Sequence, residues 1–196
     1  AFLLNYYTDT ALIGAGAIAT MFLVCRVFDG ITDLLMGGIV DKTSTKLGKA
    51  RPWLIASAPL SFLGIVLLMN VPMGLGENGK LVYAYITYIF MSCIVYTIYG
   101  ISNTALLPLM THDKDDSTML ATFSALGNNI IGLIAGSLIT PLVLNLGWKT
   151  SSIILGFAAG VLILISGLLN KEMGNDEDTK KMAGIPMSQQ LPATLK

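Results

Sequence analysis

The stretch CRVFDGITDLLMGG, residues 25–38, places three charged residues inside one of the most apolar parts of the chain. Arg26, Asp29 and Asp33 are three and four residues apart, so they share one face of an α-helix. Ionised groups are costly in a bilayer centre and almost always face a bundle interior or a water-filled cavity. The stretch therefore predicts a membrane helix whose polar face is turned toward the inside of a helical bundle.

The composition of the chain is that of a membrane protein. Its 196 residues are 54% hydrophobic and 12% charged, with a mean hydropathy of +0.70, whereas soluble domains are about a quarter charged. The formal net charge is zero, so no nucleic-acid partner is expected. The sequence has no nucleophile–base set and no His/Cys cluster, which argues against an enzyme. Cys25 and Cys93 lie in separate apolar runs and are expected to be buried thiols that act only as inert packing residues.

Five apolar runs follow one another, and each has the length of about 20 residues that a membrane-spanning helix needs. We expect helices over residues 11–40, 52–73, 81–111, 119–146 and 150–170. Residues 1–10 are too short to span and are expected to end a preceding helix. The sequence thus predicts an all-α membrane protein, cut inside its first helix, with a transmembrane bundle over 1–170 and a polar linker or tail over 171–196.

Lysine and arginine are distributed unequally between the two ends of these expected helices. The connector over 42–51, the tail over 171–196 and Lys114 together hold nine basic residues on one side. The opposite side holds only Lys80 and Lys149. Because basic residues concentrate in cytoplasmic loops, we expect the connector and the tail to be cytoplasmic.

The two carboxylates on the charged face predict a cation site. A structural ion pair with Arg26 would neutralise one carboxylate and leave the second unpaired. Oxygen ligands from Asp29, Asp33 and the nearby Thr32 would suit Na⁺ or Li⁺, and the same carboxylates can take up a proton. We therefore expect these three residues to bind a coupling cation, with Arg26 as electrostatic support.

A further ligand can be sought at the same depth in the membrane. Asp29 is twelve residues before Asp41, where its helix should meet the cytoplasm. In the helix expected over 81–111, Thr97 is eleven residues before Pro108, where that helix should end or kink. Both side chains would lie roughly 17 Å from this boundary at 1.5 Å per residue. The hydroxyl of Thr97 is therefore expected to meet the carboxylate face.

Three stretches carry a resemblance to a known family. They are NYYTD (5–9), RVFDGITDLLMGGIVDKTSTKLGKARPW (26–53) and VYTIYGISNTALLPLMTHD (95–113). They resemble the glycoside–pentoside–hexuronide:cation symporters, the melibiose-permease-like branch of the major facilitator superfamily. The resemblance implies an amino-terminal bundle made of the end of helix 1 and helices 2–6, in the plasma (inner) membrane of a bacterium. It also implies a partner in the missing carboxy-terminal half of the same transporter.

The resemblance carries over to individual positions of the cation site. Asp29 and Asp33 are at the positions of the family's two cation-site aspartates. Thr32 is at the position where melibiose permeases have an asparagine ligand, and Thr97 matches the helix 4 threonine that completes the site. The depth argument and the resemblance thus select the same hydroxyl.

The sugar site of melibiose permeases is matched less closely. Gly100 and Thr104 are at the positions of an aspartate that hydrogen-bonds the sugar and a tryptophan on which the sugar packs. Ser124 replaces a helix 5 arginine of the family. Tyr96 and Tyr99 are candidate aromatic residues of a substrate pocket.

The connector resembles the general signature of the superfamily's loop 2–3. Two interpretations of its basic residues stay open: they latch an inward gate by pairing with acids or helix ends, or they only set the topology. The candidate gate residues are Gly37, Asp41, Lys42, Gly48, Lys49 and Arg51.

The resemblance implies secondary active transport by alternating access. The substrate would be a sugar (a glycoside, pentoside or hexuronide), and Na⁺, Li⁺ or H⁺ would drive its uptake, with no cofactor besides this coupling cation. Two alternatives stay open: a proton-coupled antiporter of another solute, and a channel or scaffold subunit of the membrane. We expect the 196-residue chain not to transport by itself.

Overall fold

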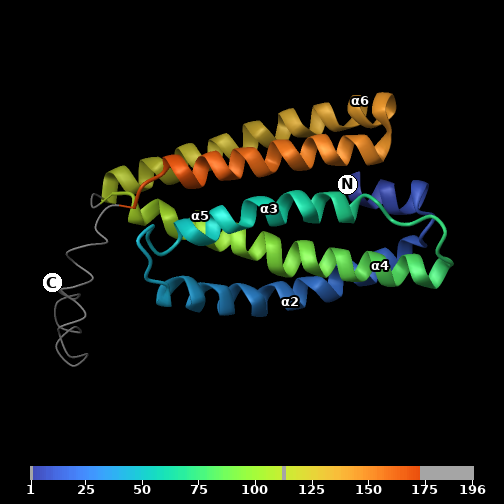
Figure 1. Cartoon of the computed structure of the whole chain (residues 1–196), viewed down its shortest axis with the longest axis horizontal. Coiled ribbons are helices and arrows are strands. Elements are labelled where there is room, and N and C mark those ends of the chain that lie inside the picture. The colour runs from blue at the N-terminus through green and yellow to red at the C-terminus, as the bar shows by residue number, and fades with distance from the viewer. Residues whose placement is uncertain (1, 112–113, 173–196) are drawn as a thin grey trace.

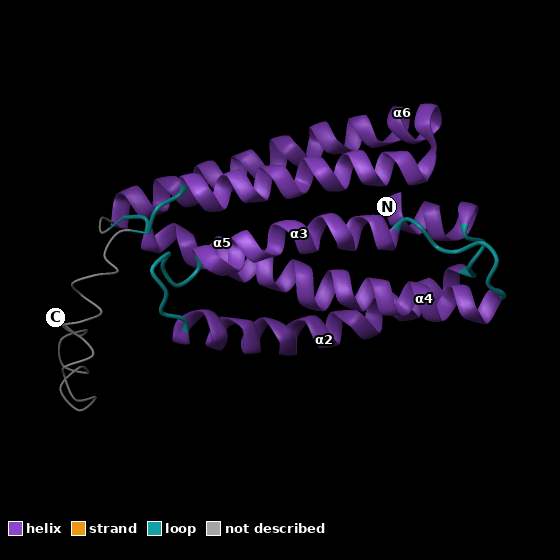
Figure 2. Ribbon diagram, in the orientation of Figure 1, coloured by secondary structure: helices purple, strands orange, loops and turns teal. Residues whose placement is uncertain are grey.

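The computed structural model describes residues 2–111 and 114–172, which form a bundle of long helices (Figure 1). In chain order the elements are α1 (Phe2–Asn5), the π-helix η1 (Tyr6–Thr10), α2 (Ala15–Lys42), α3 (Arg51–Leu68), α4 (Glu77–Ile89), the π-helix η2 (Phe90–Tyr96), α5 (Thr97–Leu109) and α6 (Lys114–Leu169). Figure 2 shows helices and loops but no strand in the described part of the chain. The all-α class predicted from the sequence is confirmed. Of the expected tail, residues 173–196 lie outside the described residues.

Helix α2 carries the charged stretch and is 28 residues long, about 42 Å at 1.5 Å per residue. It begins four residues later than expected because residues 11–14 form a turn in which Leu12 has a φ of 59°. It ends at Lys42, where the Thr43 hydroxyl donates to the carbonyl oxygen of Ile39 at 2.7 Å. Asp29 and Asp33 therefore lie in the middle of a helix long enough to cross a membrane.

Helices α4, η2 and α5 follow one another without a break from Glu77 to Leu109. The expected helix over 81–111 corresponds to this rod. The rod ends one residue after Pro108, which the sequence identified as an end or a kink. Its middle section, η2, has π-helical geometry, with turns wider than those of an α-helix.

Helix α6 consists of two helices joined at a sharp bend. Gly147 has a φ of 74° and a ψ of 166°, values that interrupt an α-helix and that glycine adopts at low cost. The bend lies in the gap expected between the helices over 119–146 and 150–170. Figure 1 shows the two parts side by side and antiparallel, with the second part next to α3.

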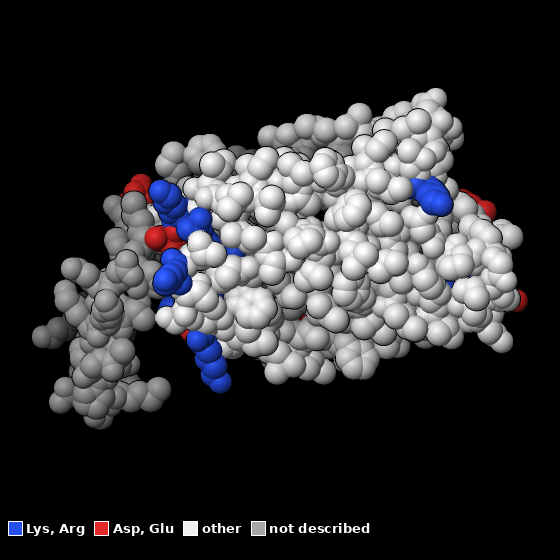
Figure 3. All heavy atoms as spheres, in the orientation of Figure 1, with Lys and Arg blue, Asp and Glu red and all other residues white. Residues whose placement is uncertain are grey.

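Loops at the two ends of the bundle alternate along the chain. The loop over 43–50, the end of α5 and the start of α6 lie at one end, and the loop over 69–76 and the Gly147 bend lie at the other (Figure 1). On the face shown in Figure 3, most Lys and Arg side chains gather at the first of these ends. The unequal distribution of basic residues along the sequence is therefore also a spatial one.

The bundle exposes many large apolar side chains, as expected of a protein surrounded by lipid or by other helices. Three helical stretches of the described chain are long and apolar enough to cross a membrane: Arg51–Leu68, Glu77–Leu109 and Asp115–Leu169, the last of which contains the bend. Buried apolar side chains form two clusters. One cluster includes Met21 and Cys25, and the other includes Met36 and Val40. The polar residues of α2 lie between these clusters.

Candidate functional site

The Asp29 carboxylate lies at the centre of a polar cluster between α2 and η2. Its side chain is 19% exposed. The Ser92 hydroxyl donates to this carboxylate and lies 2.8 Å from Oδ1 and 3.0 Å from Oδ2. The Cys93 thiol donates to Oδ1 at 3.2 Å. Two groups of η2 therefore hold a partly buried carboxylate in a fixed orientation.

Arg26 takes only a peripheral part in this cluster. Its Nη1 lies 4.0 Å from Oδ2 of Asp29, and its side chain is 84% exposed. An ion pair of such exposure contributes little to stability, typically below about 1 kcal/mol. The carboxylate of Asp29 is thus held more closely by Ser92 and Cys93 than by the arginine that precedes it by one turn.

The hydroxyls of Thr32 and Thr97 form the second half of the cluster. Their Oγ1 atoms are 3.3 Å apart and join α2 to the first residue of α5. Thr32 Oγ1 lies 3.0 Å from the carbonyl oxygen of Asp29, and Thr97 Oγ1 makes a long contact of 3.5 Å with the carbonyl oxygen of Ser92. A chain of hydrogen bonds therefore links the Asp29 carboxylate to both threonines through Ser92.

Thr97 lies beside the part of α2 that the sequence predicted, but its hydroxyl meets the hydroxyl of Thr32 and not the carboxylate of Asp29. The residues of η2 that meet Asp29 lie four and five positions before Thr97. Asp33, one turn after Asp29, is exposed and lies outside the hydrogen-bonded cluster. Of the four expected cation ligands, three thus lie in one connected cluster, and the fourth lies on the adjacent open surface of α2.

Sequence reasoning missed Ser92 and Cys93. Cys93 is four residues before Thr97, one α-helical turn away, and this spacing could have identified it. Ser92 is five residues before Thr97, about 140° around an α-helix at 100° per residue. A π-helix closes its turns with hydrogen bonds between residues five apart, which brings Ser92 back to the Thr97 side. The sequence carries no comparable signal for this π-helical segment.

A cavity of about 460 Å³ lies between α5 and α6, with a mostly apolar lining that includes several polar side chains. Two of the candidate substrate residues, Tyr99 and Ser124, line it. Three further polar side chains do so as well, and the sequence had not identified them. They are Asn103, Asn128 and Ser166.

The other candidate substrate residues lie outside the lining of this cavity. Tyr96 is 65% exposed. Thr104 is exposed and donates its hydroxyl to the carbonyl oxygen of Gly100 at 2.9 Å. A Cβ built on Gly100 would have nothing within 4 Å among the described residues. The substrate residues expected from the sequence are thus divided between the cavity and an open face of α5.

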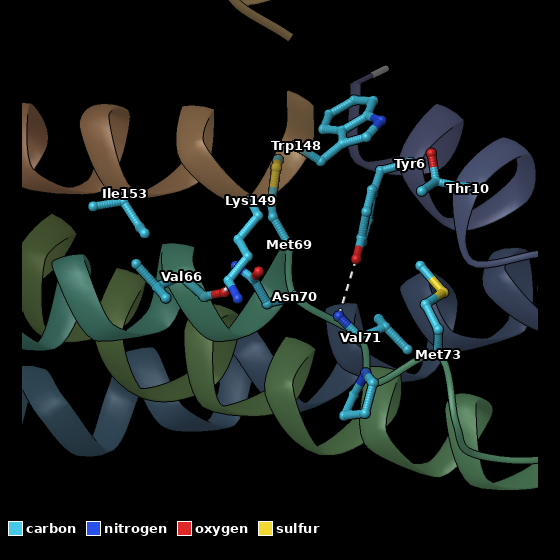
Figure 4. A pocket seen from close by; sticks show the side chains of 11 residues that line it. Tyr6, Thr10, Val66, Met69, Asn70, Val71, Met73, Trp148, Lys149 and Ile153 are labelled. Atoms are coloured by element: carbon cyan, nitrogen blue, oxygen red, sulfur yellow. Dashed lines mark hydrogen bonds between the residues drawn. The ribbon is translucent and has the colours of Figure 1, made fainter. Parts of the chain in front are cut away.

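A second cavity, of about 520 Å³, lies at the end of the bundle opposite the loop over 43–50. Two of its lining residues, Tyr6 and Trp148, pack against each other, with ring centroids 5.0 Å apart (Figure 4). The N–H of Val71 donates to the Tyr6 hydroxyl at 2.9 Å. Lys149 lines the same cavity. This cavity contains none of the residues that the sequence proposed for cation or substrate.

The candidate gate loop is fastened by a residue that the sequence had not identified, Glu172. Its carboxylate accepts hydrogen bonds from the backbone N–H groups of Lys49, Ala50 and Arg51 at 2.8, 2.9 and 3.0 Å. These N–H groups belong to the start of α3, where the helix dipole favours an anion. Gly48 has a φ of 115°, and a Cβ there would collide with the Glu172 carboxylate.

Arg51 makes a second connection between the start of α3 and the end of α6. Its guanidinium donates to the carbonyl oxygens of Gly167 and Leu168, both at 3.1 Å, in the last turn of α6. Each of the two helix ends therefore receives the charge that its dipole favours. Asp41 and Lys42 are exposed and are not part of this arrangement. A Cβ built on Gly37 would meet nothing within 4 Å in the described part of the chain.

Helix packing and a polar cluster at the middle of α2 together define a class, a polytopic helical membrane protein with an internal polar site. Comparison with known proteins then identifies the family. A family model described as "MFS/sugar transport protein" matches residues 1–187. The chain belongs to this family of major facilitator transporters.

Individual relatives agree with this assignment. The chain is 34% identical over 163 residues to an inner membrane symporter (YicJ) of Escherichia coli, a match that covers 83% of the chain and 35% of the relative. It is 35% identical over 145 residues to a glucuronide carrier protein homolog of the same bacterium, with 74% and 31% covered. An isoprimeverose transporter of Lactiplantibacillus pentosus is 30% identical over 202 residues, with 98% and 41% covered. The chain thus spans between 31% and 41% of the length of these relatives, which are transporters and not enzymes.

Proposed function

We propose that the chain is the amino-terminal bundle of a symporter that couples sugar uptake to a cation gradient by alternating access. The observation that carries the proposal is the hydrogen-bonded cluster of Asp29, Ser92, Thr97 and Thr32 in the middle of the bundle. Facilitator-type transporters bind their substrates near the bilayer midplane, between two halves that rock around the site. A carboxylate surrounded by hydroxyls at this depth is a suitable site for a coupling cation.

Asp29, Asp33, Thr32 and Thr97 are the proposed cation ligands. Na⁺ and Li⁺ are hard cations that prefer oxygen ligands, and all four residues supply oxygen. Asp33 lies on the exposed surface of α2. In the proposal this surface lines the cavity between the two halves of the transporter, where Asp33 can contact a cation bound to Asp29. Arg26 is the proposed electrostatic support, because its guanidinium is near Asp29 without occupying the carboxylate. H⁺ remains a third candidate, since either carboxylate can be protonated.

The cavity between α5 and α6 is the proposed half-site for sugar. Amide and hydroxyl groups from Asn103, Asn128 and Ser124 offer both donors and acceptors to sugar hydroxyls. The ring of Tyr99 offers an apolar surface beside them. Tyr99 is two residues after Thr97 on α5, so the proposed cation and sugar sites share this helix.

A sugar is the proposed substrate class because of both the family and the names of the relatives. Two of the relatives are named for glucuronides and for isoprimeverose. Within this class we propose a glycoside, pentoside or hexuronide. The concentration of basic residues at one end of the bundle supports a cytoplasmic location for the loop over 43–50 (Figure 3).

The proposal can be tested in the complete transporter that carries this chain. Proteoliposomes would be given a panel of radiolabelled glycosides, pentosides and hexuronides under imposed gradients of Na⁺, Li⁺ or H⁺. We expect saturable uptake of one sugar class that is stimulated by at least one inward cation gradient. Stimulation only by an outward proton gradient would indicate an antiporter, and ion conductance without saturable uptake would indicate a channel. Either result would contradict the proposal.

A further inference from the structure

The hydroxyl of Ser92 occupies a specific position in front of the Asp29 carboxylate. Its oxygen lies 2.8 Å from Oδ1 and 3.0 Å from Oδ2. Two nearly equal distances place the hydroxyl in front of both carboxylate oxygens. A cation that binds beside one of these oxygens, on the side facing η2, would therefore also lie next to the Ser92 oxygen.

Ser92, on the π-helix η2, contacts two different parts of the polar cluster. Its side chain contacts Asp29 on α2, and its carbonyl oxygen faces the Thr97 hydroxyl at 3.5 Å. Thr97 in turn lies 3.3 Å from Thr32. The Ser92 hydroxyl thus contacts the carboxylate, and its backbone carbonyl lies beside the threonine hydroxyls. Local π-helical turns are frequent at functional sites.

A serine hydroxyl has one hydrogen and two lone pairs. After it donates its hydrogen to one carboxylate oxygen, the lone pairs remain available to a hard cation, which prefers oxygen ligands. The neighbouring Cys93 thiol also contacts Asp29, but its sulfur is a soft ligand that suits Na⁺ or Li⁺ poorly. Of the two η2 side chains on this carboxylate, only Ser92 combines a donor to Asp29 with an oxygen ligand.

We propose that Ser92 is a further member of the cation site, which orients the Asp29 carboxylate and adds a neutral oxygen ligand that sets the preference between Na⁺ and Li⁺. This inference rests on the proposed function of the Asp29 cluster. Residues that orient metal ligands typically change metal affinity by roughly 10- to 100-fold when they are removed. The number and strength of oxygen ligands also determine which cation a site prefers.

The experiment measures sugar uptake by the complete transporter in proteoliposomes as a function of Na⁺ and of Li⁺ concentration. Ser92→Ala and Ser92→Cys remove the hydroxyl oxygen, the second with little change in size, and Ser92→Thr retains it. Ser102→Ala is the matched control, because Ser102 lies further along the same rod, is buried and has no hydrogen-bond partner in the described structure. Sugar binding at saturating cation reports whether each variant is folded.

We expect Ser92→Ala and Ser92→Cys to raise the half-saturating Na⁺ concentration by at least about tenfold and to change the Na⁺/Li⁺ ratio. Ser92→Thr and Ser102→Ala should stay within about threefold of the wild type. If Ser92→Ala fails to bind sugar at any cation concentration, Ser92→Cys decides by the same criterion. Unchanged half-saturation, or a loss of uptake that is equal at every cation concentration, would overturn the inference.

Asp29→Asn in the same assay separates this inference from the proposed function. If Asp29→Asn abolishes cation dependence and the Ser92 variants do not alter it, only the role of Ser92 is wrong. If Asp29→Asn also leaves cation dependence unchanged, the proposed cation site itself is wrong.

Discussion

The carboxylate of Glu172 allows a quantitative prediction about how α6 is joined to the candidate gate loop. In Glu172→Ala, three N–H groups at the start of α3 lose a charged acceptor that is 2.8–3.0 Å away. Loss of a capping side chain typically costs about 0.5–2 kcal/mol. Loss of an anion at a partly buried helix N-terminus costs up to about 2 kcal/mol. Because the two effects overlap, we expect a loss of about 1–3 kcal/mol in the free energy of unfolding.

Thermal unfolding of the purified protein in detergent measures this loss. For chains of 150–250 residues, 1 kcal/mol corresponds to about 2–4 °C, so the apparent Tm should fall by about 2–12 °C. Glu172→Gln retains one oxygen acceptor, so its Tm should fall by an intermediate amount. The matched control is Lys171→Ala, which removes an exposed charge from the adjacent position and should have little effect. A Tm of Glu172→Ala within about 1 °C of the wild type would refute the reasoning.

Three further predictions concern the loop, the helix packing and the cation cluster. Gly48→Ala should lower the Tm at least as much as Glu172→Ala, because a φ of 115° is strained for alanine and the new Cβ displaces the Glu172 carboxylate. If the losses of Tm add up in the double variant Gly48→Ala/Glu172→Ala, this explanation is wrong. Gly167→Ala places a Cβ 2.7 Å from Ile55 Cγ1 and should lower the free energy of unfolding by about 1–3 kcal/mol through overpacking. The control is Gly132→Ala, whose Cβ would have nothing within 4 Å and which should leave the Tm unchanged or slightly raised. Thr97→Val should raise the half-saturating cation concentration for sugar uptake by about tenfold, whereas Thr97→Ser should retain near wild-type values; equal effects of the two would exclude a role for the hydroxyl.

The apolar runs and the helical period were sufficient to predict several features of the structure. The length of about 20 residues for a membrane span identified the helices that carry the site. Spacings of three and four placed Asp29 on the same helix face as Arg26 and Asp33, but only Asp29 is turned into the bundle, and Arg26 and Asp33 are exposed. Counting residues to the membrane boundary placed Thr97 at the depth of α2, and the structure brings it within 3.3 Å of Thr32. Each of these predictions depends on a regular helix.

The residues that sequence reasoning missed depend on irregular or long-range structure. Ser92 reaches Asp29 because η2 is π-helical, and the α-helical period places it on another side of the rod. Glu172 contacts backbone groups more than 120 positions away in the sequence, across a helix packing that no local pattern specifies. The polar lining by Asn103 and Asn128 likewise results from the pairing of α5 with α6.

The central claim is that the Asp29 cluster binds the cation that drives sugar uptake. The most direct measurement is cation-stimulated uptake by Asp29→Asn and Asp33→Asn variants of the complete transporter, under an imposed Na⁺, Li⁺ or H⁺ gradient. We expect each variant to lose stimulation by the coupling cation, with Asp29→Asn the more severe because its carboxylate is the centre of the hydrogen-bonded cluster. Full cation stimulation in both variants would contradict the claim.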